Sequence, residues 1–339
     1  MSKLFLALAL TLAACSAPTA LPPSNVAAGH EVRLGRPAGT ENLFVQGRDE
    51  IFEYTRHGRL VHSMPLGKEP APGGGLAFDS SGYLYATSDY FDVAVFAPQS
   101  RQLVRTISDG VYEPLTLAVD HSDNLYVANG QNGEGDIEIF PPGSTTPSTT
   151  ITQGIYDPES LAFDSSGNLY VGNGLYADTV TVYSPNGTFL RAITDGVRDP
   201  ESIALDAHDD LFVANTEDGE GRTVTVYAPG TTKLVQTITD GIRCPQALTV
   251  DTAGNLYVAN WANSTATVYA AKTRKLLRTI SKNVAAPWVI AVDPTDHLYV
   301  GDMGRAPEVS VYSPERDRPT RTIPGDNQWI PIALSFGSP

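Results

Sequence analysis

Cysteine is scarce in this 339-residue chain, which contains only two, Cys15 and Cys244. Two cysteines cannot build the dense disulfide framework that stabilises many small exported domains, so a sizeable hydrophobic core must stabilise the fold. The composition permits such a core, since 41% of the residues are hydrophobic and only 18% are charged. These proportions also exclude an intrinsically disordered chain.

Basic residues are also in deficit. The chain has 23 Lys and Arg against 38 Asp and Glu, which gives a formal net charge of −15. A protein with this charge repels phosphate backbones. We therefore expect no nucleic-acid partner, whereas cations, basic proteins and neutral glycans are compatible ligands.

The apolar run near the N-terminus, residues 4–12, is too short to span a bilayer as a stable helix. It follows Lys3 and precedes small residues, which is typical of an export signal. Residues 12–15, Leu-Ala-Ala-Cys, resemble the bacterial lipoprotein box. The resemblance implies cleavage before Cys15 and attachment of fatty acyl chains, such as palmitate, to that cysteine. A simple secretory signal that happens to contain a cysteine is the alternative.

We therefore expect three segments: a lipoprotein signal peptide over residues 1–14, a tether rich in Pro and Ala over residues 15–40, and one domain over residues 41–339. The mature protein would be exported and lipid-anchored to the bacterial cell envelope. Ser16 after the cysteine favours the outer membrane, by analogy with the sorting rule of enteric bacteria. With Cys15 acylated, Cys244 would have no partner for an intramolecular disulfide, and we expect a small buried side chain there.

Helical periodicity is absent after residue 42, which excludes leucine-rich and helical solenoids. Instead, one phrase recurs at intervals of 41 to 45 residues, and a fixed period of this size is typical of a propeller or solenoid. Its copies are Leu43-Phe44-Val45, Leu84-Tyr85-Ala86, Leu125-Tyr126-Val127, Leu169-Tyr170-Val171, Leu211-Phe212-Val213, Leu256-Tyr257-Val258 and Leu298-Tyr299-Val300.

Each repeat contains four short apolar segments separated by turn residues, which predicts four β-strands. In one repeat these are residues 203–206, 211–213, 223–227 and 234–238. Four strands per repeat make a propeller blade. We call them the first to fourth strands of a blade, and we predict an all-β fold.

The two ends of the chain fix the number of blades. The first repeat lacks its first strand, and residues 332–334 supply a first strand with nothing after it. We therefore predict a seven-bladed β-propeller of four-stranded blades, closed by pairing the C-terminal strand with the N-terminal three strands. Small residues should recur in the first strands where the blades converge, at Ala77, Ala118, Ala162, Ala204, Thr249, Ala291 and Ala333. Bulky residues should end the third strands, at Tyr54, Phe96, Phe140, Tyr183, Tyr227, Tyr269 and Tyr312.

The segment from Pro158 to Asn173, Pro-x-x-Leu-Ala-Phe-Asp-x-x-Gly-Asn-Leu-Tyr-Val-Gly-Asn, resembles the NHL-repeat and gluconolactonase-like propellers. A similar residue pattern recurs in four further repeats. The Arg that many NHL repeats carry after the Asn or Asp is missing, which argues against a nucleic-acid role of that type. Gluconolactonase-like enzymes hold a metal ion in an acidic axial funnel, so the resemblance permits Ca²⁺ or Mg²⁺ here.

The turns between first and second strands are short and uniform, and their Asp residues are expected to cap the turn backbone. The opposite face carries the candidate site, because acids collect there and the repeats differ there. We predict ligand-binding residues at Glu159, Glu201, Asn173, Asn215, Asn260 and Trp288, and metal ligands at Glu159, Glu201, Asn173 and Asn215. The alternative is that the asparagines satisfy turn backbone groups and the acids form a solvated surface.

Histidine is placed on other parts of the repeats. None of the six falls on the acidic face, which makes a His-based lyase or a His-rich zinc site a poor match. The leading hypothesis is thus a cell-envelope lipoprotein that acts as a monomeric binding or scaffolding propeller without catalysis. The alternatives are a metal-dependent hydrolase or lactonase that uses the acidic funnel, and a purely structural surface protein.

Overall fold

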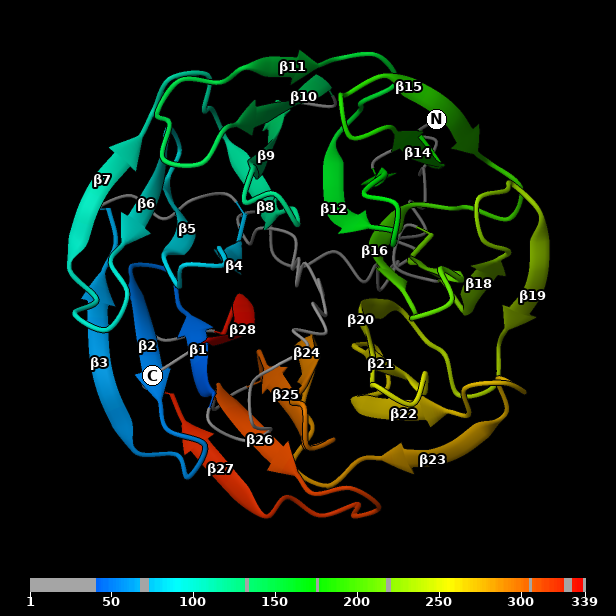
Figure 1. Ribbon diagram of the computed structural model, residues 1–339. Coiled ribbons are helices and arrows are strands. Elements are labelled where there is room, and N and C mark those ends of the chain that lie inside the picture. Colours follow the sequence, from blue (N-terminus) through cyan, green and yellow to red (C-terminus); the bar gives the residue numbers. More distant parts are fainter. Residues whose placement is uncertain are drawn as a thin grey trace, which may run out of the picture.

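The computed structural model describes residues 41–67, 73–131, 134–174, 177–217, 221–304, 307–325 and 331–337. In this part of the chain all regular structure is β-strand, arranged as seven antiparallel four-stranded sheets around a central axis (Figure 1). The predicted seven-bladed propeller is confirmed. The expected signal peptide and tether, residues 1–40, lie outside the described residues.

Each blade runs from an innermost first strand to an outermost fourth strand (Figure 1). The first strands are β28 (Ala333–Gly337), β4 (Leu76–Phe78), β8 (Pro114–Val119), β12 (Pro158–Phe163), β16 (Pro200–Leu205), β20 (Pro245–Val250) and β24 (Pro287–Val292). The second strands are β1 (Asn42–Gln46), β5 (Leu84–Asp89), β9 (Leu125–Gln131), β13 (Leu169–Asn173), β17 (Leu211–Asn215), β21 (Leu256–Asn260) and β25 (Leu298–Asp302). The third strands are β2 (Glu50–Tyr54), β6 (Asp92–Phe96), β10 (Glu134–Phe140), β14 (Thr179–Tyr183), β18 (Thr223–Tyr227), β22 (Thr265–Tyr269) and β26 (Glu308–Tyr312). The fourth strands are β3 (Leu60–Pro65), β7 (Leu103–Ile107), β11 (Thr149–Ile151), β15 (Phe189–Ile193), β19 (Leu234–Ile238), β23 (Leu276–Ile280) and β27 (Arg321–Pro324).

The hydrophobic core consists of seven clusters, one between each pair of neighbouring blades. The second strands are buried on both faces, which explains their continuous apolar sequence. The bulky residues that end the third strands are buried, as predicted. Tyr183, for example, is fully buried in the cluster between its own blade and the preceding one, and its hydroxyl donates to the carbonyl of Gln153 at 2.6 Å. The same bond recurs at Tyr227, Tyr269 and Tyr312, so in four blades a tyrosine fastens the blade to the loop that leads into it.

The ring closes through β28, which pairs antiparallel with β1 over five residue pairs. One detail of the prediction is wrong. Ser335 lies opposite Phe44, the place that Ala118 takes opposite Tyr126 in its blade, whereas Ala333 pairs with Gln46. The closing strand is thus shifted by two residues, and the small residue at the point of convergence is Ser335.

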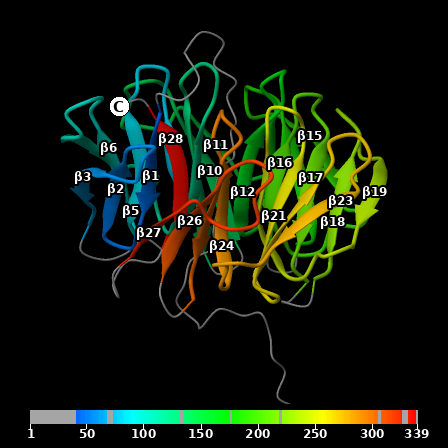
Figure 2. The ribbon, with the colours of Figure 1, turned by 90° about the horizontal axis from the view of Figure 1, so that it is seen from below.

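The strands run between two faces that carry the loops (Figure 2). We name the face with the turns between first and second strands the turn face. There the repeated Asp residues cap the backbone as predicted: Asp120 accepts the amides of Ser122 and Asn124 at 2.8 and 2.9 Å. We name the other face, where the first strands begin, the mouth face.

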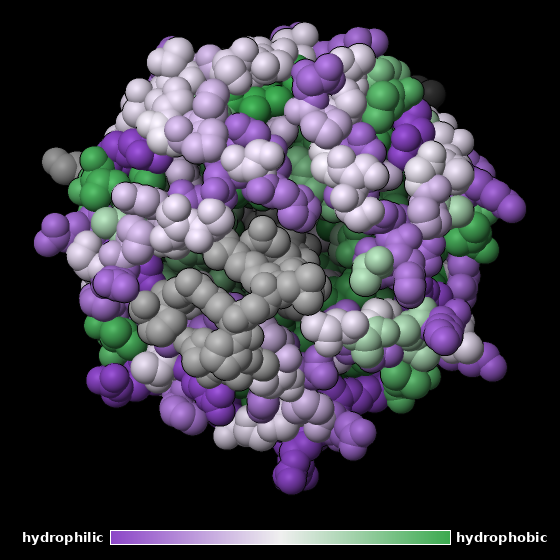
Figure 3. All heavy atoms as spheres, in the orientation of Figure 1, coloured by the Kyte–Doolittle hydropathy of each residue, from purple (hydrophilic) through white to green (hydrophobic). Residues whose placement is uncertain are grey.

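Apolar side chains on the surface are scattered. Figure 3 shows them as separate patches around the rim of a mostly polar disc. Those with high exposure on the outermost strands are Leu60, Leu103, Val104, Leu190, Val235 and Leu277. Among the described residues, none forms a helix that is long and apolar enough to cross a membrane.

Candidate functional site

On the mouth face, five first strands begin with a proline followed by a β-bulge. The ladder shifts register at the residue after Pro114, Pro158, Pro200, Pro245 and Pro287. The residue before each proline has a positive φ, between 44° and 52°, at Glu113, Asp157, Asp199, Cys244 and Ala286. This conformation costs about 1–2 kcal/mol for a residue with a Cβ. It turns the carbonyl toward the end of the second strand, where Asp157 accepts the amide of Gly174 at 3.0 Å.

The bulge residues form a ring at the start of the innermost strands, which we name the mouth ring. By strand pairing, its seven positions are Gly74, Leu115, Glu159, Glu201, Gln246, Trp288 and Ile332. Polar residues occupy three consecutive blades, and apolar residues or glycine occupy the other four. A repeat that served the fold alone would give no reason for this division, so the mouth ring is the candidate site.

Four carboxyl groups from two neighbouring blades meet in the polar sector, Asp157 and Glu159 before β13 and Asp199 and Glu201 before β17. Burial raises the pKa of Glu159 well above its usual range, and the negative charges of Glu201, Asp157 and Asp199 add to the effect. Burial also raises the pKa of Glu201 to about 8, with further contributions from Asp199 and Asp157.

Asp157 and Glu159 form a pair of buried carboxyl groups. The two side chains are within hydrogen-bonding reach, and burial raises the pKa of Asp157 as well. Both residues are more than nine-tenths buried, with 6% and 7% exposure. Among the described residues, no N–H or Ser, Thr or Tyr hydroxyl reaches Oδ2 of Asp157 or Oε2 of Glu159. A carboxylic acid that donates to a carboxylate is the arrangement that satisfies them at neutral pH.

Gly174 makes room for this cluster. A Cβ on Gly174 would lie 2.7 Å from Cγ of Glu159 and 3.4 Å from Oδ1 of Asp199. The Glu159 side chain therefore lies over the end of β13 and faces the loop of the next blade. Gly130 plays the same part under Leu115, the mouth-ring residue of the preceding blade, where a Cβ would lie 2.4 Å from the leucine Cδ1.

Two further polar atoms of the mouth ring lack a partner. Gln246 and Trp288 are each 5% exposed, and neither Oε1 of Gln246 nor Nε1 of Trp288 makes a hydrogen bond. Trp288 packs against Leu334 and Val45 of the closing blade, with Trp261 and Met303 beside it. Each buried polar atom without a partner costs about 1–3 kcal/mol. Buried polar atoms without a partner on adjacent blades mark this part of the mouth ring as a candidate binding site.

The predicted asparagines have structural contacts instead. Asn173, Asn215 and Asn260 are buried, and Oδ1 of each accepts a backbone amide two residues before the proline of its own blade, at 2.8–3.1 Å. Their Nδ2 groups donate to threonines of the third strand, such as Thr181 at 3.0 Å. These bonds brace the loop that carries Glu159 or Glu201, which agrees with the alternative that the asparagines satisfy turn backbone groups; a ligand role for them stays a prediction.

The described residues contain no group of three or more His, Cys, Asp or Glu side chains arranged to hold a metal ion. The carboxyl groups of Glu159 and Glu201 come from adjacent blades, but the amide oxygens of Asn173 and Asn215 are engaged with the backbone. The metal site therefore stays a prediction, and the carboxyl groups of Glu159 and Glu201 are the predicted ligands that remain available for it.

The sequence pattern did not single out Asp302 as a residue with a shifted pKa. It replaces the asparagine at the end of its second strand, is 2% exposed, and pairs with Glu308. Burial raises the pKa of Asp302 to about 8, which the backbone amide of Ala285 opposes and the charge of Glu308 reinforces. The backbone amide of Ala285 corresponds to the backbone amide of Tyr156, from which Asn173 accepts a hydrogen bond. Asp302 thus occupies the place of the asparagine, but neither of its carboxyl oxygens has a hydrogen-bond partner among the described residues.

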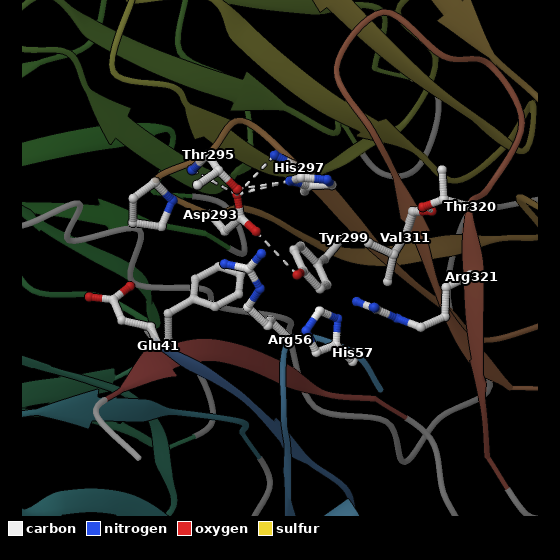
Figure 4. Close-up of a pocket in the computed structure, with 12 residues that line it drawn as sticks. Glu41, Arg56, His57, Asp293, Thr295, His297, Tyr299, Val311, Thr320 and Arg321 are labelled. Atoms are coloured by element: carbon white, nitrogen blue, oxygen red, sulfur yellow. Dashed lines mark hydrogen bonds and ion pairs between the residues drawn. The ribbon is translucent and has the colours of Figure 1, made fainter. Parts of the chain in front are cut away.

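A separate cavity of about 180 Å³ opens on the turn face beside the closing blade. Figure 4 shows Arg56, His57, Arg321 and His297 around it. Cationic side chains are balanced by Glu41 and Asp293 in the same lining, so the charge favours no ligand class. The sequence places His57 and His297 in turns but gives no signal that the two turns share a cavity.

His297 is not part of a catalytic triad. Its Nδ1 lies 2.9 Å from Oγ1 of Thr295 and 3.5 Å from Oδ1 of Asp293. Both contacts use the same ring nitrogen, whereas a relay needs one nitrogen for the nucleophile and the other for the acid. The group caps its turn, as Figure 4 shows by the bonds converging on Asp293.

Cys244 is fully buried, as expected, and its Sγ lies 3.4 Å from Nε2 of Gln246. It is disulfide-bonded, however, so the expectation that it has no disulfide partner is wrong. Cys15, the expected lipidation site, lies outside the described residues.

Comparison with models of known protein families found no match, and a search of curated proteins found no similar sequence. The fold is compatible with an NHL-type propeller, and the finer resemblance has no support beyond the repeat itself.

Proposed function

We propose that this chain is a binding propeller of the bacterial cell envelope, with its ligand site at the mouth ring. The observation that carries the proposal is a pair of buried polar atoms on adjacent blades, Oε1 of Gln246 and Nε1 of Trp288, which have no hydrogen-bond partner among the described residues. A fold that buries such atoms without compensation loses stability, and a ligand that supplies the missing bonds restores it. The β-propeller fold suits a binding role, since its loops converge on one axis.

Binding is favoured over hydrolysis by the chemistry at the mouth ring. Catalysis there would require a general base or a metal-bound water. The described histidines lie in turns of the turn face or, for His62, on the outer strand β3. The raised pKa values of Glu159 and Glu201 keep protons on carboxyl groups that a metal would need ionised.

Melting temperature measured with a ligand panel tests the site. The panel contains Ca²⁺, Mg²⁺, neutral disaccharides and short basic peptides. A ligand present at 100 times its Kd should stabilise the parent by about 2.7 kcal/mol. Glu201→Gln and Trp288→Phe should reduce this gain, and the exposed turn-face variant Glu315→Gln should keep it. Stabilisation that survives in both mouth variants would place the site elsewhere and refute the proposal.

The envelope attachment rests on the lipoprotein-box resemblance at Cys15 and the Pro-rich segment after it. Two or three acyl chains on one cysteine would hold the protein at a membrane far more firmly than a single chain does. We predict that the full chain pellets with membranes and that Cys15→Ser releases it into the soluble fraction.

Retention of the Cys15→Ser variant in membranes would contradict the anchor. Cys244 is disulfide-bonded in the structure and Cys15 is the only other cysteine of the sequence, so that disulfide and acylation of the Cys15 sulfur exclude each other. Mass spectrometry of the Cys15 peptide under non-reducing conditions decides between them: an acylated peptide supports the anchor, and a peptide linked to Cys244 contradicts it.

A further inference from the structure

The turn-face cavity lies where the closing blade meets the last blade. β28 and β1 come from opposite ends of the chain, so no turn joins the first and second strands of the closing blade. In other blades that turn packs against the second residue after the third strand: a Cβ on Gly82 would lie 3.6 Å from Pro98, and one on Gly167 would lie 3.4 Å from Pro185. In the closing blade this position is Arg56, which lines the cavity of about 180 Å³. An arginine thus borders the cavity at a position that is proline or alanine in the other six blades.

Arginine and histidine side chains reach the cavity from two blades. Arg56 and His57 belong to the turn between β2 and β3, whereas Arg321 lies on β27 and His297 lies in the turn before β25. In Figure 4 the guanidinium group of Arg321 extends toward His57 and Tyr299. The formal charges of the lining balance, so the hydrogen-bonding groups that are still available decide which ligand fits.

The carboxylate of Asp293 is occupied by its own blade. Its Oδ1 accepts the backbone amides of Thr295 and His297, each at 2.9 Å, and the Thr295 hydroxyl at 2.8 Å. Its Oδ2 accepts the Tyr299 hydroxyl at 3.2 Å. An ionised carboxylate has about four acceptor positions, so these bonds leave Asp293 little capacity for a ligand.

Arg321, in contrast, has donors left. Arg101, which is also enclosed between two blades, pairs with the Glu53 carboxylate at 3.0 Å. Arg321 forms no ion pair within the described part of the chain, and its guanidinium group contacts the Tyr299 hydroxyl. A guanidinium group carries five N–H donors, so this contact leaves most of them available. The His57 ring likewise makes no hydrogen bond with a described residue, and the available groups of the cavity are therefore mainly donors.

We infer that the turn-face cavity binds a small oxyanion, a carboxylate or phosphate group, between Arg321 of the last blade and Arg56 and His57 of the closing blade. The planar fork of an arginine matches two oxygen atoms of such a group. The size agrees, since 180 Å³ lies below the range of about 300–1,000 Å³ for pockets that hold drug-sized ligands. This site is separate from the mouth ring and does not depend on the function proposed there.

The net charge of −15 does not exclude an anion from this cavity. Exposed charges further away than a Debye length, about 8 Å at physiological ionic strength, are largely screened. The cations that would hold the anion are part of the lining itself, where Arg56 offsets the charge of Glu41. An oxyanion between the two blades would contact both of them, so its binding should stabilise the closed ring by mass action.

Isothermal titration with sodium phosphate and with sodium acetate tests the inference, in bis-Tris chloride at pH 7.0 and constant ionic strength. We expect saturable binding of at least one probe, and the probe that binds identifies the source of the oxyanion. Arg321→Gln should weaken binding at least about tenfold, and His57→Gln about threefold. Arg243→Gln, the same change at an exposed residue of the mouth face, should bind as the parent does. The probe that binds should also raise the melting temperature of the parent and leave that of Arg321→Gln unchanged.

No saturable binding of either probe, equal binding by the parent and Arg321→Gln, or an equal loss in Arg321→Gln and Arg243→Gln would overturn the inference. The melting temperature without ligand shows whether each variant is folded. His57 is exposed, so His57→Gln keeps the test decisive if Arg321→Gln does not fold. Binding that is unchanged in His57→Gln would then overturn the inference.

Discussion

At the scale of single residues, Asp302 is an exception to the pattern of the repeat. Five blades carry Asn or Asp as the fifth residue of the second strand, and four of these side chains are asparagines whose amide both accepts and donates. The backbone amide of Ala285 lies near Asp302 and lowers its pKa, but neither carboxyl oxygen has a hydrogen-bond partner among the described residues, and the amide donor is lost. Only its protonated form can donate, so its stability contribution depends on pH.

We predict that Asp302→Asn stabilises the protein at pH 8 and changes little at pH 4.5. The pKa of Asp302 is raised to about 8 in the folded protein, so ionisation is opposed by folding. The stability present at pH 4 is therefore lost progressively as pH rises toward 8. The asparagine has no proton to lose, and the expected gain at pH 8 is roughly 1–3 kcal/mol.

Urea denaturation of parent and variant at the two pH values measures this difference. Asp49→Asn, a change at an exposed residue between β1 and β2, serves as the control for removing a negative charge. An equal gain for Asp302→Asn at both pH values would show that the residue is not protonated in the folded protein.

At the scale of the elements, the sequence predicts the strands and blades but not the register of every strand. The number of blades, the four strands in each and the closing strand follow from the period and from the incomplete repeats at both ends, because strand alternation and turn residues are local signals. The Asp caps of the turn face follow for the same reason. Ser335 could not be identified, because an isolated strand carries no marker of its register against a partner about 290 residues away.

The mouth ring was predicted only in part. Glu159, Glu201 and Trp288 could be chosen because the repeats differ at these positions, and they occupy equivalent places. The role of the asparagines could not be assigned, since a polar residue at a strand end looks the same whether it faces a ligand or a backbone amide. The raised pKa of Glu159 and the bulges depend on burial and on the left-handed residues before the prolines, which no local pattern reveals.

At the scale of the whole molecule, the residues that stabilise the ring differ from those that form the candidate site. Seven clusters between blades and the pairing of β28 with β1 hold the ring, and every blade contributes alike. The mouth ring breaks that equivalence, with acids on two blades and Trp288 across from Leu115. A net charge of −15 adds a field that attracts cations toward the protein.

The most direct test of this account is the indole N–H resonance of Trp288 in ¹⁵N-labelled protein during titration with the panel ligand that raises the melting temperature most. The chain has three tryptophans, and Trp288→Phe identifies the signal. We predict that the Trp288 resonance shifts and saturates over the same ligand concentrations as the melting temperature, because the side chain is part of the mouth ring. Saturable shifts that leave Trp288 unchanged and appear instead at the turn-face cavity, at His297 or Tyr299, would contradict the central claim.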